Sequence, residues 1–118
     1  RRFVNTVVNQ GTDITYTDSA SLGATFTINA SGVYSISVSE EANGASVAGL
    51  SLNSTELSTG IVSMTRADVL SMSATSLNTP NVSTVTAYFV VGDVIRSHTQ
   101  GSAAGIATRT YFTITRVS

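Results

Sequence analysis

The stretch FTINASGVYSISV, residues 26–38, decides the fold. Apolar and polar residues alternate on both sides of a polar tetrapeptide, NASG at 29–32. Alternation with a period of two is typical of strands that bury one face, and a cluster of Asn, Ser and Gly between two such runs indicates a turn. Gly32 allows the backbone conformations that a tight reversal requires. The stretch therefore predicts two strands joined by a tight turn.

The rest of the chain has the same character. Serine and threonine are abundant, valine and isoleucine are frequent, there is one proline, and no segment carries a sustained helical apolar stripe. Alternating runs that recur every 8–12 residues or so are typical of a sandwich or barrel, so we predict an all-β, antiparallel fold of about ten strands. The predicted strands are 3–9, 12–17, 23–29, 32–39, 46–53, 57–64, 68–76, 83–91, 93–99 and 107–117.

Size and composition limit the classes of protein that fit. The chain has 118 residues, no cysteine and a net charge of −1, and residues 1–118 are expected to form a single domain. All basic residues are arginines without a clustered stripe, which argues against nucleic-acid binding. No apolar run approaches the roughly 20 residues of a membrane span. Because the sequence opens RRFV without a methionine, we expect the C-terminal part, or a processed fragment, of a longer protein.

Alternate residues of each strand point to opposite sides, so the core can be predicted strand by strand. The expected core residues are Phe26, Ile28, Tyr34, Ile36, Val38, Ala48, Leu50, Leu52, Leu70, Met72, Ala74, Val85, Ala87, Phe89, Val91, Phe112 and Ile114. Two strands carry large side chains on the opposite face as well, namely Tyr88 with Val90 and Tyr111 with Val117. Lone surface tyrosines are ordinary, but aromatic residues on the back of two strands also fit a second buried surface.

Three longer polar connections, at 40–46, 77–83 and 98–106, alternate with tight connections such as 29–32 and 90–93. In an antiparallel succession such connections lie at the same end of the sheet, and loops on a rigid scaffold often carry binding sites. We therefore expect a distal loop cluster. Its candidate binding residues are Glu40, Glu41, Asn43, Asn78, Asn81, His98 and Gln100.

Catalytic chemistry has little support in the sequence. His98 is the only histidine, it lies in the polar stretch SHTQGSAAG, and no Gly-x-Ser-x-Gly motif supplies a nucleophile. We expect a solvated histidine, no catalytic residue and no enzyme. Carboxylates are the ligands that calcium prefers, and Glu40 and Glu41 are the first candidates for a metal. No cofactor is expected otherwise.

Phe26, then five further residues, then Gly32-Val33-Tyr34-Ser35-Ile36 form a pattern that resembles the signature of the complement C1q and tumour-necrosis-factor jelly rolls, although Ile36 replaces an aromatic residue. The turn in Tyr88-Phe89-Val90-Val91-Gly92-Asp93-Val94 and the strand Phe112-Thr113-Ile114 also look like this family. The resemblance implies a ten-stranded jelly roll that packs as a threefold homotrimer. It places Tyr88, Val90, Tyr111 and Val117 in the trimer interface. Some relatives bind calcium near the trimer apex.

The weakly charged, cysteine-free chain rich in Ser, Thr and Asn is similar to bacteriophage fibre, head-fibre and appendage proteins that carry this jelly roll. This likeness implies a virion structural protein, assembled in the host cytoplasm and exposed on the virion surface. Its partners would be two further copies and other virion proteins, a fibre shaft or the capsid.

Two functions stay open at this point. One is a structural knob or capsid decoration domain, which needs only the interface. The alternative is an adhesin tip that recognises a host-surface glycan or protein through the distal loops. The loops contain no Trp or Tyr to stack on a sugar ring, which favours the structural function.

Overall fold

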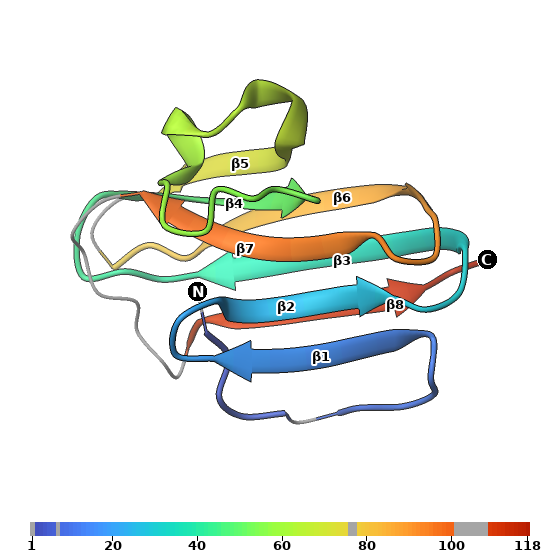
Figure 1. Cartoon of the computed structure of the whole chain (residues 1–118). Helices are drawn as coiled ribbons and strands as arrows, with labels where there is room; N and C mark the ends of the chain where they lie inside the picture. The colour runs from blue at the N-terminus through green and yellow to red at the C-terminus, as the bar shows by residue number, and fades with distance from the viewer. Residues whose placement is uncertain (1, 7, 76–77, 101–108) are drawn as a thin grey trace.

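The computed structural model describes residues 2–6, 8–75, 78–100 and 109–118 (Figure 1). Within them, antiparallel strands form two sheets, a five-stranded sheet of order β1-β2-β7-β4-β5 and a three-stranded sheet of order β6-β3-β8. The strands are β1 (Ile14–Ser19), β2 (Gly23–Ile28), β3 (Gly32–Glu40), β4 (Ser46–Leu52), β5 (Val69–Thr75), β6 (Asn81–Phe89), β7 (Val94–Gln100) and β8 (Tyr111–Arg116).

The stretch that decides the fold joins the two sheets. β2 pairs with β1 and β7, whereas β3 pairs with β6 and β8, so these consecutive strands run in opposite directions but are not neighbours in one sheet (Figure 1). The expected strands and turn are present, and the turn carries the chain across the sandwich. The chain crosses the sandwich here because every second side chain of β2 and of β3 is buried, and these side chains meet from opposite sheets in the same core.

The core lies between the sheets. Its buried residues are Ala24, Phe26, Ile28, Tyr34, Ile36, Val38, Leu50, Phe89 and Ile95. Phe26 of the five-stranded sheet stacks on Phe112 of the three-stranded sheet, with ring centroids 3.9 Å apart and planes inclined by 10°. Phe3 packs beside both rings. Its ring centroid lies 6.4 Å from that of Phe26 and 5.6 Å from that of Phe112. The N-terminal segment therefore covers the sandwich at this edge, with the Tyr16 hydroxyl donating to the Phe3 carbonyl.

Two predicted strands are wrong. The described residues of 3–9 form no strand, and 57–64 instead contains the 3-10 turn η1 (Ile61–Ser63), which is followed by η2 (Arg66–Asp68). Ile61 is fully buried over Gly49, where a Cβ atom would lie 2.6 Å from the Ile61 side chain. The absence of a side chain at Gly49 therefore lets segment 53–68 pack on the outer face of the five-stranded sheet instead of extending it.

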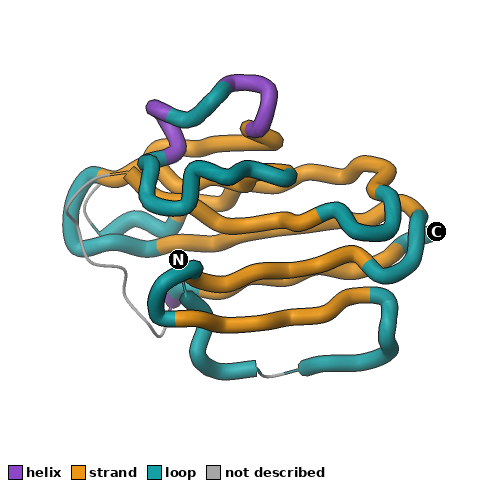
Figure 2. Tube along the Cα trace, in the orientation of Figure 1, coloured by secondary structure: helices purple, strands orange, loops and turns teal. Residues whose placement is uncertain are grey.

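The 3-10 turns of this segment are the purple elements at the top of Figure 2. Across the described ranges, no helix has the length and apolar character that a membrane crossing requires.

Candidate functional site: the outer face of the three-stranded sheet

Tyr88 and Tyr111 lie on the side of the three-stranded sheet that faces away from the core. Tyr88 is 65% exposed while its neighbour Phe89 is buried, and Tyr111 is 58% exposed. Val90 and Val117 are exposed on 50% and 56% of their surfaces. The outward orientation expected for all these side chains therefore agrees with the structure.

The strand register shows how these residues are arranged. Tyr88 pairs with Val33, and the Val117 amide donates to the Val33 carbonyl at 2.8 Å, so an apolar group forms at one end of the face. At the other end, Ser39 pairs with Tyr111 on one side and with Val82 on the other. The rows between the two ends consist of serine and threonine. They contain Ser35, Ser37, Thr84, Thr86, Thr113 and Thr115.

We call this surface the Tyr88–Tyr111 face and define it by Val33, Val82, Tyr88, Val90, Tyr111 and Val117. Val82 is 53% exposed and was missed by the sequence analysis, because the strand was expected to start at residue 83. The alternation Val82, Thr84, Thr86, Tyr88 contains the signal that would have found it. In the described part of the chain nothing covers this face, whereas segment 53–68 covers part of the five-stranded sheet's outer face.

Two of the three predicted loops meet at one end of the sandwich. The Asn78 amide donates to the Ala42 carbonyl at 3.0 Å, and both Asn43 and Asn78 are exposed. Asn81 is buried at the start of β6, where its side-chain amide donates to the Ser73 carbonyl at 2.8 Å. Gln100 ends β7 and is partly buried. Residues 101–106 of the third loop lie outside the described residues.

Glu40 and Glu41 are buried and do not project from a loop. Glu40 is the last residue of β3, and Glu41 is 2% exposed with its carboxylate paired to Arg109 at 3.0 Å. Among the described residues, no group of three or more His, Cys, Asp or Glu side chains has the arrangement of a metal site. Calcium binding at these glutamates therefore has no support there.

His98 does not lie in a solvated loop, and that expectation was wrong. It belongs to β7 and is 5% exposed under segment 53–68, and its Nε2 atom shares a hydrogen bond of 2.8 Å with the Ser51 hydroxyl. Burial lowers the pKa of His98, while a hydrogen bond to the Thr59 backbone opposes this shift.

A serine and a histidine at this distance have the geometry of a nucleophile and its base. The Ser51 side chain, however, has no exposed surface, so a substrate cannot reach its hydroxyl. The pair thus links β4 to β7 beneath segment 53–68 and offers no open site for catalysis.

The strand order and the two antiparallel sheets define a jelly roll of the tumour-necrosis-factor and C1q type, as the sequence predicted. The structure is similar to that of Eiger TNF from S. frugiperda, with a TM-score of 0.56 and 13% sequence identity over 87% of this chain and 69% of that chain. No family model matches the sequence, and no curated protein is detectably similar to it. The likeness is therefore one of fold.

Proposed function

We propose that this chain is a non-enzymatic structural domain that assembles into a homotrimer through the Tyr88–Tyr111 face. The proposed role is that of a knob or decoration domain of a bacteriophage head or tail fibre or appendage, on the virion surface. The observation that carries the proposal is a sheet face that no described residue covers and that exposes tyrosines and valines, namely Val82, Tyr88, Val90, Tyr111 and Val117.

The chemistry of this face suits contact between proteins. Aromatic residues are enriched in protein interfaces, and burying a valine or a larger apolar side chain contributes roughly 1.5–3 kcal/mol. The serines and threonines between the two apolar ends are short, so another backbone can approach closely, and their hydroxyls can bond to a partner or to water. No charged side chain lies in the paired rows between the two ends, so no ion needs to be desolvated there.

The virion role is supported by composition. The chain is only 11% charged, contains no cysteine and is rich in Ser and Thr, as in the phage appendage proteins that it resembles. A fibre shaft or a capsid protein would be its further partner.

Recognition of a host-surface glycan or protein is the second candidate function. The contact between Ala42 and Asn78 brings two loops together at one end of the molecule, and Asn43 and Asn78 are exposed there. In a trimer, three such loop sets would act together, so that weak sites gain avidity.

Oligomeric state tests the principal proposal. Light scattering on a sizing column should give a mass near three chains, and Val90→Asp should give monomer or aggregate. Val62→Asp is a matched control, because Val62 on η1 is also 50% exposed but lies away from the face. A monomeric wild type, or soluble intact trimers of both Tyr88→Asp and Tyr111→Asp, would contradict the proposal.

Cell attachment separates the two functions. Asn43→Ala with Asn78→Ala should abolish attachment if the loops recognise a receptor, while the mass stays unchanged. Unchanged attachment would favour the structural function.

A further inference from the structure

Segment 53–68 covers part of the outer face of the five-stranded sheet, and among the described residues its backbone is bonded to strand backbone only at its two ends (Figure 1). At one end the Asn53 amide donates to the Val94 carbonyl at 2.8 Å, and at the other the Val69 amide donates to the Arg66 carbonyl. The backbone hydrogen bonds between these ends stay inside the segment. The middle of the segment can therefore leave the sheet without breaking a ladder of backbone hydrogen bonds.

The contact between the segment and the sheet has an apolar and a polar part. Ile61 is fully buried and Met64 is 7% exposed, so these two side chains supply the apolar part. The polar part is a row of alternate residues on β7, in which Arg96, His98 and Gln100 share the face that points away from the core. Two apolar anchors and this polar row therefore hold the segment in place.

Two members of the row bury polar atoms that lack a partner. The Nη1 atom of Arg96 donates to the Ser54 carbonyl at 3.1 Å, but its Nε atom is buried with no hydrogen-bond partner within the described residues. The Gln100 side chain lies so close to Gly60 that a Cβ atom there would collide with it, and its Oε1 atom is likewise buried without a partner in the described ranges. Such atoms are costly to bury, and water would satisfy both once the segment has left.

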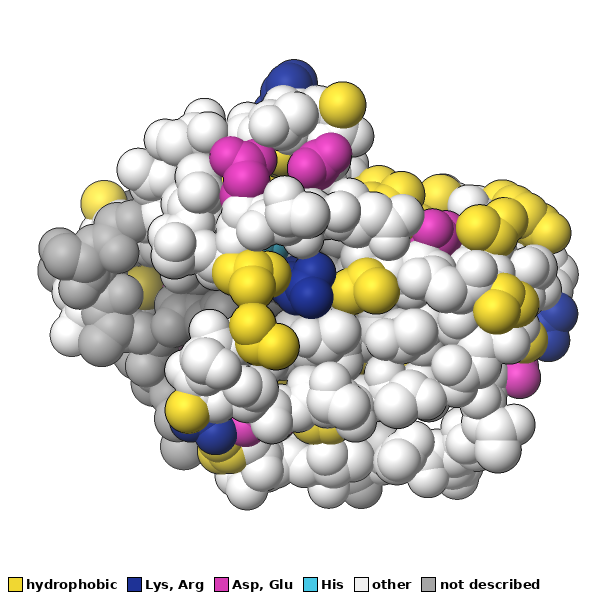
Figure 3. All heavy atoms as spheres, viewed as in Figure 1, with side chains coloured by type: hydrophobic (Ala, Val, Ile, Leu, Met, Phe, Trp, Pro, Cys, Tyr) yellow, Lys and Arg dark blue, Asp and Glu magenta, His cyan; other side chains and the backbone are white. Residues whose placement is uncertain are grey.

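His98 is the member of the row that titrates near neutral pH. It is 5% exposed, and Figure 3 shows almost nothing of the chain's one histidine. Its Nε2 atom shares a hydrogen bond of 2.8 Å with the Ser51 hydroxyl, and a hydrogen bond to the Thr59 backbone raises its pKa, as expected if the ring donates to the Thr59 carbonyl. A neutral imidazole donates from one nitrogen and accepts at the other, so the Ser51 hydroxyl donates to Nε2.

Protonation of His98 would disturb this arrangement. Both nitrogens of a cationic imidazole donate, so the Ser51 hydroxyl would have to turn round and lose the acceptor for its own hydrogen. The Ser51 side chain has no exposed surface, and within the described residues its hydroxyl has no second partner. The buried cation would also lack hydration. When the segment has left the sheet, water can hydrate the cation and bond to the serine, so protonation favours the open arrangement.

The charges around His98 give its cation little support. Burial is the largest cause that lowers its pKa, and the amino terminus of the chain and Arg96 lower it further, whereas Glu56 on the segment raises it. Arg2 lines the same hollow as His98 but is paired with Asp18 at 2.7 Å. The strands β2, β4 and β5 contribute no charged side chain. Among the described groups that act on the ring, a single carboxylate therefore opposes its burial.

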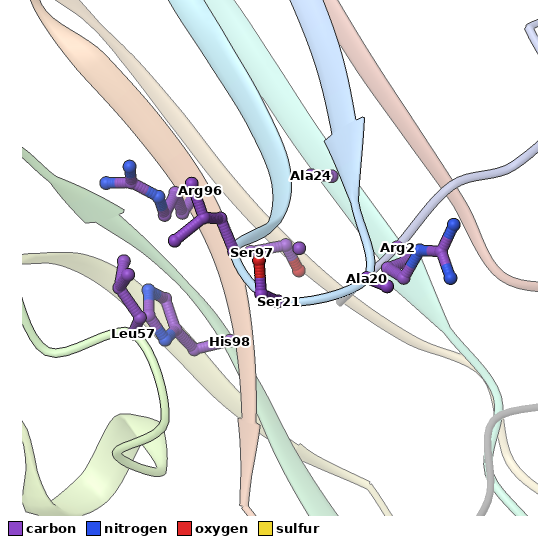
Figure 4. A pocket seen from close by; sticks show the side chains of 10 residues that line it. Arg2, Ala20, Ser21, Ala24, Leu57, Arg96, Ser97 and His98 are labelled. Carbon is purple, nitrogen blue, oxygen red and sulfur yellow. The ribbon is translucent and has the colours of Figure 1, made fainter.

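Solvent can reach the ring at the edge of the segment. A hollow of about 230 Å³ lies between the β1–β2 turn, the segment and β7, and Leu22, Leu57, Arg96 and His98 are among its lining residues. Figure 4 shows Leu57 of the segment next to the ring of His98, with Arg96 projecting from the same strand. A proton can therefore enter from this hollow.

We propose that segment 53–68 is an acid-released strap, which leaves the outer face of the five-stranded sheet when His98 takes up a proton while the sandwich stays folded. Release uncovers the outer faces of β4 and β7. The proposal does not depend on trimer formation, because one protomer supplies every group and the Tyr88–Tyr111 face lies on the other sheet.

Single cysteines can measure the opening, because the chain contains no cysteine of its own. Met64→Cys places a thiol at a buried anchor of the segment, Ser63→Cys places one at its exposed neighbour, and Val38→Cys places one in the core. The reaction of each full-length variant with dithiodipyridine is timed at pH 7.0 and 5.5. Division by the Ser63→Cys rate removes the pH dependence of the thiol itself.

The Met64→Cys rate, divided in this way, should rise about three- to tenfold from pH 7.0 to 5.5, since one proton changes the opening equilibrium at most tenfold per pH unit below about 6.5. The Val38→Cys rate should stay at least about tenfold lower at both pH values, because the core opens only when the whole chain unfolds. His98→Gln should abolish the rise. Glu56→Gln is the matched control and should retain it, because its carboxylate is not the titrating group.

Equal rates for Met64→Cys and Val38→Cys would overturn the proposal, since the segment would then open only with the whole chain. A ratio that does not change with pH, or the same rise in His98→Gln, would overturn it as well. Ile61→Cys, at the other anchor, serves with the same expectations if Met64→Cys does not fold.

Discussion

Mild acid should destabilise this protein through the buried residue His98. Burial lowers the pKa of His98 in the folded protein, whereas in the unfolded chain the imidazole titrates near its ordinary value of about 6.5. Below about pH 6.5 the unfolded state therefore binds more protons than the folded state, and the free energy of unfolding falls. Neutral His98 therefore makes its full contribution to the free energy of unfolding above about pH 6.5. This contribution is lost as the pH falls toward the lowered pKa of the folded protein.

The size of the effect has an upper limit that follows from the structure. One imidazole can take up one proton, so the slope contributed by His98 is at most about 1.4 kcal/mol per pH unit. The charged groups that act on the ring oppose each other, because Arg96 lowers the pKa and Glu56 raises it. Burial beneath segment 53–68 remains the largest cause of the shift.

Urea unfolding between pH 7.0 and 5.5 measures this slope. The chain contains no other histidine, so the part of the slope that disappears on replacing His98 is assigned to its imidazole. His98→Gln removes the titrating group and retains an amide that can bond to Ser51, and it should flatten the profile. The same slope in both proteins, or a wild type that becomes more stable as the pH falls, would refute the reasoning.

Two further substitutions test the packing on either side of the five-stranded sheet. Gly49→Ala places a Cβ atom against the Ile61 side chain and should lower the free energy of unfolding by about 1–3 kcal/mol, measured by urea denaturation; an unchanged value would mean that segment 53–68 is not packed there. Phe112→Ala removes the ring that stacks on Phe26 and should cost about 3 kcal/mol, measured in the same assay. A loss below about 1 kcal/mol would show that this contact contributes little to joining the sheets.

Local alternation predicted much of the fold. β2, β3 and β7 begin and end within one residue of their expected bounds. Buried and more exposed positions alternate along all of β2 and along residues 32–38 of β3. The outward orientation of Tyr88 and Tyr111 follows from the same pattern. The segments 3–9 and 57–64 were misjudged because in each of them one apolar residue packs against an edge or a face that other strands create. Phe3 covers the end of the core, and Ile61 occupies the space left by Gly49.

The candidate sites also differ in how far the sequence predicts them. The Tyr88–Tyr111 face lies on strands whose side chains follow a period of two, so most of it could be predicted. The burial of His98 could not, because a polar stretch indicates exposure unless another segment covers it. The hollow lined by Leu22, Leu57 and Arg96 was equally hidden, since the β1–β2 turn, the segment after β4 and β7 meet only in the folded chain.

The sequence by itself determined the all-β class, the jelly-roll type and most of the residues that face the core, since a strand's two sides are distinguished by neighbouring residues alone. Ala74 and Val91 were expected in the core as well, but both are exposed. Only the tertiary structure decided which strands pair and which glutamates and histidine are buried. These properties depend on contacts between segments far apart in the chain, because burial and electrostatic pairing are set by the groups that surround a side chain in space.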